Sequence, residues 1–308
     1  MGEQKKQMQI AAVVVTFNRL SYLQRLIPRL LDIQELDAIL IVDNASTDGT
    51  PQWLSALNNE RVKVHLLEQN MGGAGGFHVG LEWSYSLGYE LTWMMDDDGL
   101  PDLDCLGTLL EYRNDFDFWG PAVLAEQNPE KLCFPVRVPR HATASRTLAE
   151  LVEYSNAGSV EGVVIPFNGV LVKRSLVEKI GVPRAEFFIW GDDVEYLWRA
   201  ARAGARVATV VDAHFLHPAT DDLGAPMMFG KTTYNHSPSD LKHYCMARNN
   251  TVNLLEYRSI LHVIGFWVKT AWFYTFVVPS MSRWKISVSA IWAGLRKNFT
   301  GHKRFLRG

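Results

Sequence analysis

Three consecutive aspartates, Asp96 to Asp98, follow an apolar run of five residues and precede a Gly-Leu-Pro turn. The run, Leu91–Met95, is typical of a buried strand flanked by turn residues. Carboxylates at the end of a buried strand are costly unless a cation meets them. Hard oxygen ligands favour Mg²⁺ or Mn²⁺, which bridge well to phosphates. The pattern favours a metal and phosphate site, and the alternative is a solvated acidic turn that caps the next helix.

Two further segments suit the binding of a nucleotide. Asp43 ends another apolar run and could accept hydrogen bonds from a base or ribose, although a turn followed by a helix cap explains the same residues. Between Asn70 and Phe77, four glycines occupy five positions before a predicted helix, which lets a backbone approach an anion closely. A tight structural turn is the alternative. The segment matches neither the dinucleotide fingerprint nor a Walker loop.

An acidic helix start and two histidines offer acid–base and metal chemistry. Asp192, Asp193 and Glu195 open a predicted helix. One acid is expected there because of the helix dipole, but three exceed what capping requires, and a carboxylate at this point could take a proton from a sugar hydroxyl. His214 and His217 follow a later strand. Either could complement the aspartates as a metal ligand, or both could be structural.

These residues follow the elements of an alternating α/β pattern, in which strands and helices succeed one another. Strand-like runs occur at Ile10–Val15, Ile39–Val42, Val62–Leu66, Leu91–Met95, Val163–Ile165 and Val207–Val211. Helix-like segments occur at Arg19–Leu31, Pro51–Leu57, Gly75–Leu87 and Leu103–Tyr112. The alternation predicts a mostly parallel sheet flanked by helices, with right-handed crossovers. Ligands bind beyond the carboxyl ends of such strands, so we expect the polar segments there to converge.

Composition places few further limits on the chain. The 308 residues include 47% hydrophobic and 21% charged side chains, as in ordinary globular proteins. Three widely spaced cysteines without a C-x-x-C pair argue against a zinc module or a disulfide framework and fit a reducing cytoplasm. The polar segment Met1–Gln9 leads directly into a strand, so we expect no signal peptide.

The C-terminal sixth of the chain differs from the rest. From about Asp240 the pattern changes to apolar and aromatic helices, and residues 257–308 hold nine Lys or Arg, no Asp or Glu, and four of the ten tryptophans. The first 256 residues carry 22 basic and 33 acidic side chains. An acidic body with a basic C-terminal segment argues against a nucleic-acid-binding protein. It favours a catalytic domain that binds to an anionic membrane.

One stretch of this region, Ser259–Ser280, is apolar enough to raise the question of a transmembrane span. It contains Lys269 near its centre, and a lysine in the middle of a bilayer costs roughly 2.5 to 3.5 kcal/mol. We therefore expect helices that lie in the membrane interface. An ordinary packed helical subdomain with a basic exposed face is the alternative.

Taken together, the segments resemble glycosyltransferase family 2 enzymes with the GT-A fold, over residues of about 10 to 256. The shared motifs, in chain order, are Val-Val-Thr16-Phe-Asn-Arg19, Val-Asp43-Asn, Asn70-x-Gly-Gly73-Ala-Gly-Gly-Phe, Asp-Asp-Asp-Gly99, Phe-Asn168-Gly, Gly-Asp-Asp193-Val-Glu and His217-Pro. Within the family, the closest likeness is to bacterial galactofuranosyltransferases that build cell-wall galactan, in particular the initiating enzyme of mycobacteria and their relatives.

The resemblance implies a GT-A nucleotide-sugar transferase domain over residues 1–256 and membrane-interface helices over residues 257–308. It implies an inverting transfer of galactofuranose from UDP-galactofuranose to a rhamnose-terminated acceptor linked to polyprenyl diphosphate. The enzyme would need Mn²⁺ or Mg²⁺ and would lie peripherally on the cytoplasmic face of the plasma membrane. The sequence does not indicate the oligomeric state.

The resemblance also implies roles for individual residues. Asp193 would be the catalytic base, and the metal would be held by Asp96, Asp98 and His217, the last lying 24 positions beyond the base. The nucleotide-sugar side would be lined by Thr16, Arg19, Asp43, Asn70, Gly73, Asp96 and Asp97. The acceptor side would be lined by Trp190, Asp192, Glu195, Tyr244 and Arg248.

Two alternatives to this function remain. A rhamnosyltransferase that uses dTDP-rhamnose would share nearly all these motifs, because the choice of sugar depends on pocket shape. A non-catalytic partner subunit could keep the fold and bind UDP. A nicotinamide oxidoreductase is disfavoured by the absence of the dinucleotide fingerprint.

Overall fold

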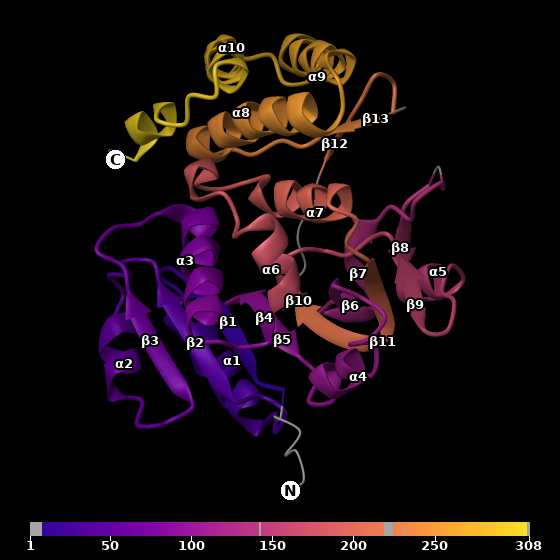
Figure 1. The fold of residues 1–308 in the computed structure, drawn as a ribbon. Coiled ribbons are helices and arrows are strands. Elements are labelled where there is room, and N and C mark those ends of the chain that lie inside the picture. The colour runs from indigo at the N-terminus through magenta and orange to yellow at the C-terminus, as the bar shows by residue number, and fades with distance from the viewer. Residues whose placement is uncertain (1–7, 142, 219–223, 231, 307–308) are drawn as a thin grey trace, which may run out of the picture.

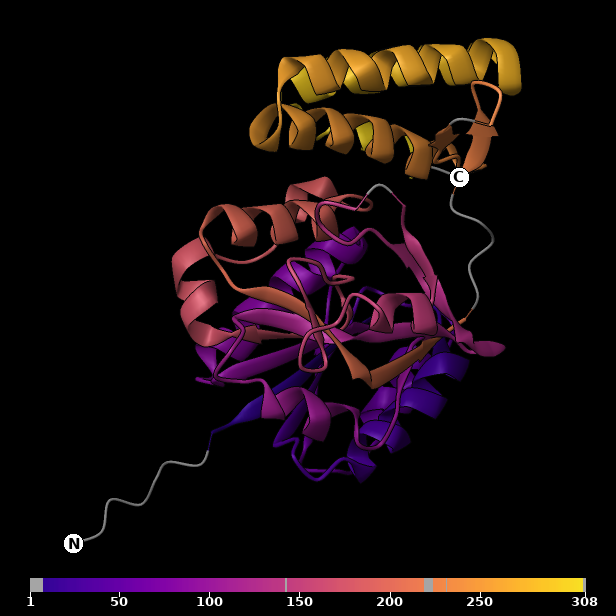
Figure 2. The ribbon, with the colours of Figure 1, turned by 90° about the vertical axis from the view of Figure 1, so that its right-hand side faces the viewer.

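The computed structural model describes residues 8–141, 143–218, 224–230 and 232–306. The prediction made for the N-terminal segment falls largely on residues 1–7, outside this part. A central sheet with helices on both faces makes up the first three quarters of the chain, and a layer of helices from the C-terminal region is stacked on one side of it (Figures 1 and 2). The predicted α/β class is confirmed.

The central sheet begins as a parallel sheet and becomes mixed. In the order β3-β2-β1-β4, each neighbouring pair is parallel. Next come β10 and then β6, with both pairings of β10 antiparallel, then β11 parallel to β6, and finally the short β5. The strands on this path are β1 (Ile10–Thr16), β2 (Ala38–Asp43), β3 (Val62–Leu66), β4 (Leu91–Asp96), β5 (Leu100–Pro101), β6 (Phe118–Ala125), β10 (Asn168–Lys173) and β11 (Val207–His217). The smaller strands β7 (Asn128–Val136), β8 (Ser145–Thr147) and β9 (Ser159–Glu161) pair with its margin.

Both faces of the sheet are covered, which explains why the central strands are apolar throughout rather than alternating. Ala12 and Val14 of β1 point into one core with α1 and α4, whereas Val13 and Val15 point into the other with α3 and α7. The covering helices are α1 (Leu20–Asp32), α2 (Thr50–Ala56), α3 (Gly72–Ser86), α4 (Cys105–Glu111), α5 (Leu148–Val152), α6 (Arg174–Ile180) and α7 (Asp192–Arg202), with a short turn η1 (Ala185–Phe187) before α7.

Glycines let α3 lie very close to β1. A Cβ atom added at Gly76 would stand 2.3 Å from Cγ1 of Val15, and one at Gly80 would stand 2.4 Å from Cγ1 of Val13. Both distances are too short for real side chains. Part of the glycine-rich segment therefore serves helix-to-sheet packing rather than ligand binding.

The predicted elements of the first half agree with the structure to within three residues, including the four strands β1 to β4 and the four helices α1 to α4. The strand predicted at Val163–Ile165 is wrong: these residues form no strand. They lie between β9 and β10, and the following Pro166 has no N–H group to pair. Val164 is buried all the same, so a short apolar run indicated burial without indicating strand pairing.

The C-terminal region is helical, as predicted from residue 240 onward, and follows a two-stranded hairpin. The hairpin comprises β12 (Ala225–Met227) and β13 (Thr232–Tyr234), and the helices are α8 (Asp240–Tyr257), α9 (Ile260–Trp272), η2 (Phe273–Val277), α10 (Met281–Leu295) and η3 (Gly301–Phe305). Helix α8 is packed between α7 and α10. The predicted domain boundary, between residues 256 and 257, falls at the C-terminal end of this packed helix.

Helices α9 and η2 keep most of their apolar side chains exposed. Within the described residues, the segment Ile260–Val277 is long and apolar enough to cross a membrane, judged by length and composition alone, and only 22% of it is buried. Its exposed apolar face comprises Ile260, Leu261, Ile264, Trp267, Val268 and Phe276. The spacing of three and four residues places them along one side of the helix.

Candidate active site

The Asp97 carboxylate ties the end of β4 to the end of β1. Oγ1 of Thr16 donates to its Oδ2 at 2.6 Å, and Nη1 of Arg19 donates to its Oδ1 at 3.0 Å. Burial, offset in part by Arg19 and Thr16, raises the pKa of Asp97 to about 6. Both carboxylate oxygens of Asp97 accept hydrogen bonds from the protein. Asp97 therefore fixes Arg19 beside the carboxyl ends of β1 and β4.

Asp98 and His217 meet directly, from strands that are far apart in the sequence. Oδ1 of Asp98 lies 3.3 Å from Nε2 of His217, and Arg19 pairs with the other oxygen of Asp98. Although burial alone would raise the pKa of Asp98, His217 and Arg19 lower it below its usual value. Burial acts to lower the pKa of His217, but the contact with Asp98 outweighs it and raises that pKa to about 10. The pair is therefore charged at neutral pH.

The other ring nitrogen of His217 is oriented by the backbone. Nδ1 lies 2.8 Å from the Pro218 carbonyl oxygen, which can only accept, so Nδ1 carries a proton and donates. This bond fixes the ring so that Nε2 faces Asp98. Metal-binding histidines are commonly oriented in this way by a carbonyl behind them. His214, the other candidate, instead lies beside Asp102, with Nδ1 3.6 Å from a carboxylate oxygen.

The Asp96 carboxylate ends β4 with no hydrogen-bond partner among the described residues. Its pKa is raised well above the usual value by burial and then by the charges of Asp98 and Asp97. A carboxylate in that environment gains strongly from an added cation or a hydrogen-bond donor. Asp96 is thus available to a ligand, unlike Asp97.

The chemistry of this cluster fits a divalent cation shared with a substrate. In the described parts of the chain, no group of three or more His, Cys, Asp or Glu side chains is arranged to hold a metal ion alone. Oδ1 of Asp98 is nevertheless a buried oxygen without a hydrogen bond, and it faces Nε2 of His217. Mg²⁺ and similar ions commonly take one or two protein carboxylates and complete their shell with phosphate oxygens and water. Two protein ligands at this place are consistent with such a shared site.

The end of β2, which pairs with the end of β1, carries a second group of polar side chains. Asp43 is buried and accepts the Ser46 amide at 3.3 Å, and burial raises the pKa of this carboxyl above its usual value. The next residue, Asn44, donates to the Gly72 carbonyl at 2.8 Å and accepts the Met71 amide at 2.7 Å. Asn44 thereby fixes the glycine-rich loop to β2. Sequence reasoning did not select it, although its place beside Asp43 at a strand end was the available signal.

Asn70 and the glycines after it shape the start of α3. Oδ1 of Asn70 accepts the Gly72 amide at 2.7 Å. Gly72 has φ +71°, and a Cβ there would stand 1.9 Å from the Phe188 carbonyl oxygen, so only glycine fits. At Gly73, by contrast, no atom lies within 4 Å of an added Cβ. Gly73 is thus the glycine with open space beside its backbone, as expected for a position near a ligand.

The acidic start of α7 brings two carboxylates together. Asp192 is buried, and Asp193 is partly accessible in the next position. Burial raises the pKa of both, and the two like charges oppose joint ionisation. Glu195 has a different role, because its carboxylate pairs with Arg199 at 2.8 Å and accepts the Tyr257 hydroxyl at 2.6 Å. Asp193 is therefore the accessible acid of the three.

The predicted acceptor residues do not all face the same space. Trp190 is partly accessible and packs against an aromatic cluster that includes Met227 and Phe273. Tyr244 is 2% exposed, and its ring contacts that of Phe305 in a tilted arrangement, with the centroids 5.4 Å apart. Neither Glu195 nor Tyr244 presents its side chain to an open surface.

Arg248 is fully buried and bound within the protein. Its guanidinium donates to the carbonyl oxygens of Phe187 at 2.8 Å and Phe299 at 3.0 Å, and its Nε donates to Asn249 at 2.8 Å. It thus joins η1 to the C-terminal segment. Its guanidinium is occupied by these bonds, so an acceptor contact by Arg248 would need them to break first.

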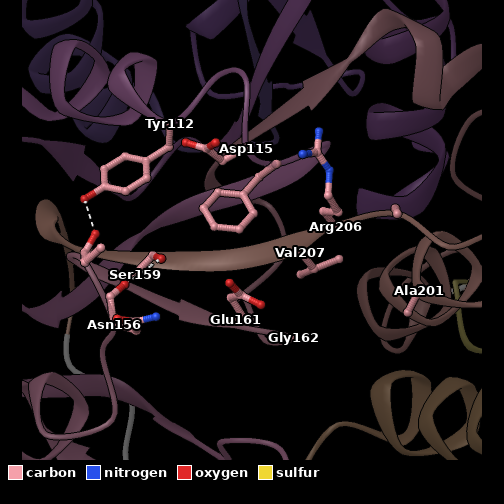
Figure 3. Close-up of a pocket in the computed structure, with 12 residues that line it drawn as sticks. Tyr112, Asp115, Asn156, Ser159, Glu161, Gly162, Ala201, Arg206 and Val207 are labelled. Carbon is pink, nitrogen blue, oxygen red and sulfur yellow. Dashed lines mark hydrogen bonds between the residues drawn. The ribbon is translucent and has the colours of Figure 1, made fainter.

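A cavity of about 670 Å³ lies away from these residues, next to the first residues of β11. Figure 3 shows Tyr112, Asp115, Glu161 and Arg206 around it. His217 ends the same strand that Val207 begins, so the cavity and the aspartate cluster lie at opposite ends of β11. The cavity is therefore not part of the candidate active site.

Sequence and fold are both similar to those of known glycosyltransferases. The family model described as glycosyl transferase family 2 matches residues 11–158. Galactofuranosyltransferase GlfT1 of Mycolicibacterium smegmatis is 30% identical over 274 residues, which cover 86% of this chain and 89% of that protein. TarS 1–349 of S. aureus is 16% identical, with a TM-score of 0.58 over 95% of this chain and 82% of that one. GalNAc-T7 with UDP, GalNAc and Mn²⁺ is 12% identical, with a TM-score of 0.58 over 82% of this chain and 48% of that one.

Proposed function

Since the chain belongs to glycosyl transferase family 2 and is a glycosyltransferase with a GT-A fold, we propose that it transfers galactofuranose from UDP-galactofuranose. The acceptor would be a rhamnose-terminated glycan linked to polyprenyl diphosphate, in cell-wall polysaccharide synthesis. Identity of 30% to a galactofuranosyltransferase across most of both chains supports this choice of donor. The observation that carries the proposal is the contact between Asp98 and His217 at 3.3 Å, beside the Asp96 carboxylate, which has no hydrogen-bond partner in the part of the chain that the structure describes.

Asp98 and His217 would hold Mn²⁺ or Mg²⁺, with Asp96 nearby, and the bound cation would neutralise charge that develops on the departing UDP. The orphaned Oδ1 of Asp98 and the backbone-oriented ring of His217 support this assignment. GalNAc-T7, whose crystal structure contains UDP and Mn²⁺, has a similar fold, and this is consistent with a divalent cation at this place.

The nucleotide would lie over the ends of β1, β2 and β4. Asp43, which is buried at the end of β2, would accept hydrogen bonds from the uridine. Thr16 and Asp97 would act mainly by holding Arg19, whose guanidinium carries positive charge toward the diphosphate. The start of α3 at Asn70 and Gly73 would approach the donor through its backbone.

Asp193 would act as the general base of a single inverting displacement. Its carboxylate would take the proton from the acceptor hydroxyl as that oxygen attacks the anomeric carbon of the donor, without a covalent enzyme intermediate. The raised pKa of Asp193 supports this role, since a base works best when its pKa approaches the working pH. Trp190, which is partly accessible and precedes Asp193 by three positions, would line the acceptor side, and the buried Asp192 would lie behind the base.

The C-terminal helices would hold the enzyme peripherally on the cytoplasmic face of the membrane, beside its lipid-linked acceptor. The exposed apolar face of α9 and η2 supports an interfacial position. The C-terminal helices also carry exposed basic residues, among them Lys269 in α9, Lys285 in α10 and Arg296 at the end of α10. Anionic lipid would attract these charges while the apolar side chains enter the headgroup boundary.

A donor screen tests the proposed function. The full-length protein is incubated with a synthetic lipid-linked rhamnoside and either UDP-galactofuranose or dTDP-rhamnose, and the product linkage is determined by NMR. We expect transfer from UDP-galactofuranose alone and loss of transfer with a chelator. Transfer from dTDP-rhamnose alone would establish the rhamnosyltransferase instead. Binding of UDP without turnover of either donor would identify a non-catalytic subunit.

A further inference from the structure

Three side chains of α8 form a stripe against the start of α7. Asn249, Asn253 and Tyr257 are spaced four residues apart, so they lie on one face of the helix. Each donates to the segment that opens α7: Asn249 Nδ2 to the Trp190 carbonyl at 2.6 Å, Asn253 Nδ2 to the Gly191 carbonyl at 2.8 Å, and Tyr257 Oη to Glu195 Oε1 at 2.6 Å. We call these three residues the α8 stripe.

The segment held by the stripe has an unfavourable backbone. Phe188 and Trp190 have φ values of +66° and +72°, although neither is glycine. Bulky residues rarely adopt this left-handed region, and they do so where surrounding contacts enforce it. Nδ2 of Asn249 also lies 3.0 Å from the Phe187 carbonyl and 3.2 Å from that of Ile189. The buried amide group of Asn249 thus bonds to three carbonyls of the strained segment.

The same segment adjoins both halves of the candidate active site. The Gly191 carbonyl accepts the Glu195 amide at 3.0 Å as well as Asn253, so the stripe is bonded to the first turn of α7. That turn carries Asp193. On the donor side, the Phe188 carbonyl accepts the Ala74 amide at 3.1 Å, at the glycine-rich start of α3. A shift of the segment would therefore displace the base and disturb the loop beside the donor.

We infer that Asn249, Asn253 and Tyr257 are positioning residues, which fix the first turn of α7, and with it the Asp193 carboxylate, without touching substrate. The two asparagines are 0% and 1% exposed, so their amides are directed into the protein. The inference rests on the proposed role of Asp193 as the base. If the inference is correct, α8 contributes to catalysis in addition to its role in packing.

Hydrogen exchange measured by mass spectrometry tests the positioning directly. The full-length protein is compared with Asn249→Ala, Asn253→Ala and Tyr257→Phe, the last of which keeps the aromatic ring and should fold normally. The matched control is Thr251→Ala, a fully buried α8 residue whose hydroxyl bonds only within its own helix, to the Ala247 carbonyl at 2.8 Å. We expect faster exchange in peptides covering residues 187–196 in the stripe variants and no local change there in the control.

Kinetics of the same variants separates positioning from stability. We expect kcat to fall between about 10- and 100-fold in the stripe variants, because small misplacements of a reacting group have such effects. The kcat of Thr251→Ala should remain near that of the unaltered protein. The dissociation constant of UDP should stay nearly unchanged in Asn253→Ala and Tyr257→Phe, because these side chains bond to Gly191 and Glu195 and not to Phe188, whose carbonyl contacts the donor loop. Unchanged exchange at residues 187–196 in Tyr257→Phe and Asn253→Ala would overturn the inference. So would an exchange increase spread evenly over the chain, or a local increase without loss of kcat.

The variant Asp193→Asn distinguishes the two possible failures. If it keeps full turnover, the proposed base is wrong, and the exchange data alone then decide whether the stripe fixes α7. If it is inactive while the stripe variants keep full kcat, the base stands and the positioning inference fails.

Discussion

Oδ1 of Asp98 lies 3.3 Å from Nε2 of His217, and this contact joins the end of β4 to the end of β11 across the sheet. Between them in sheet order stand β10 and β6. The turn after β4 carries Asp98, and His217 is the last residue of the long strand β11. Both elements are thus needed to bring this carboxylate and this imidazole together. Such a pair from distant strands stays assembled only if the whole sheet is folded.

Asp98→Ala and His217→Ala should each weaken metal-dependent binding of UDP. Loss of one of two protein ligands removes a direct contact, so we expect a loss of affinity of at least about 10-fold. Calorimetry with UDP, with and without Mn²⁺, measures it. His214→Ala is the matched control, since His214 pairs with Asp102 instead. Equal losses for the two histidine variants, or unaltered UDP binding in Asp98→Ala, would contradict the assignment.

Asp193→Asn should abolish most turnover while UDP binding stays nearly unchanged. General-base assistance is typically worth about 10²- to 10⁴-fold, and the amide cannot accept the proton. The drop in kcat is measured with UDP-galactofuranose and the lipid-linked rhamnoside. Glu195→Gln is an informative comparison, because Glu195 is occupied by Arg199 and Tyr257 and should affect folding stability more than chemistry. Turnover like that of the unaltered protein in Asp193→Asn would reject the base.

The first half of the fold was predictable from sequence because its signals are local. Apolar runs such as Leu91–Met95 end in turn residues, and a helix follows each of the strands β1 to β4 in the chain, with only the short β5 between β4 and α4. The strands between α4 and α6 were not. Strand β6 contains Gly120 and Pro121, which argue against a central strand, yet all eight of its residues are buried between β10 and β11. Pairing with partners distant in the chain decided its structure.

The candidate site was predictable to a similar extent. Convergence of strand ends followed from the parallel sheet, and it brings Thr16 to Asp97 as expected. The resemblance, rather than the spacing, favoured His217 over His214. What could not be predicted is which polar side chains are bound within the protein. Arg248 looked available in sequence, but it has no exposed surface, and such burial depends on packing between α8 and distant segments.

The pH dependence of turnover should show an acidic limb set by the carboxylates at the start of α7. Burial raises the pKa of Asp193 above the usual aspartate value, and the base must be ionised to accept a proton. Activity is therefore lost as the pH falls through that raised pKa. Burial and the Asp193 charge raise the pKa of Asp192 to about 8, so Asp192 is protonated over the range in which Asp193 ionises and adds no charge there. Asp192→Asn should therefore shift the limb very little.

Profiles of kcat/KM against pH for the two proteins measure this shift. Glu82→Gln, which changes an exposed acid on α3, serves as the control and should leave the limb in place. A limb that moves clearly to lower pH in Asp192→Asn would show that Asp192 is ionised where Asp193 titrates, which would contradict the expectation.

Charged substitutions on the exposed apolar face of α9 should reduce membrane binding without unfolding the protein. Leu261 and Ile264 are 73% and 50% exposed, so the double variant Leu261→Glu, Ile264→Glu disturbs little of the core. Each glutamate removes an apolar contact with the headgroup boundary and adds charge of the same sign as anionic lipid. Point variants are preferable to truncation because Ile286 and Ala290 of α10 are buried against α8.

Flotation of the full-length protein with liposomes, with and without anionic lipid, provides the measurement. Leu103→Glu is the matched control, because Leu103 is 54% exposed but lies before α4, remote in sequence from the C-terminal helices. We expect the unaltered protein and the control to float with anionic liposomes and the double variant to remain in the soluble fraction. Equal flotation of all three would remove α9 as the membrane contact. In that case the exposed basic residues of the C-terminal helices would have no apolar membrane contact beside them.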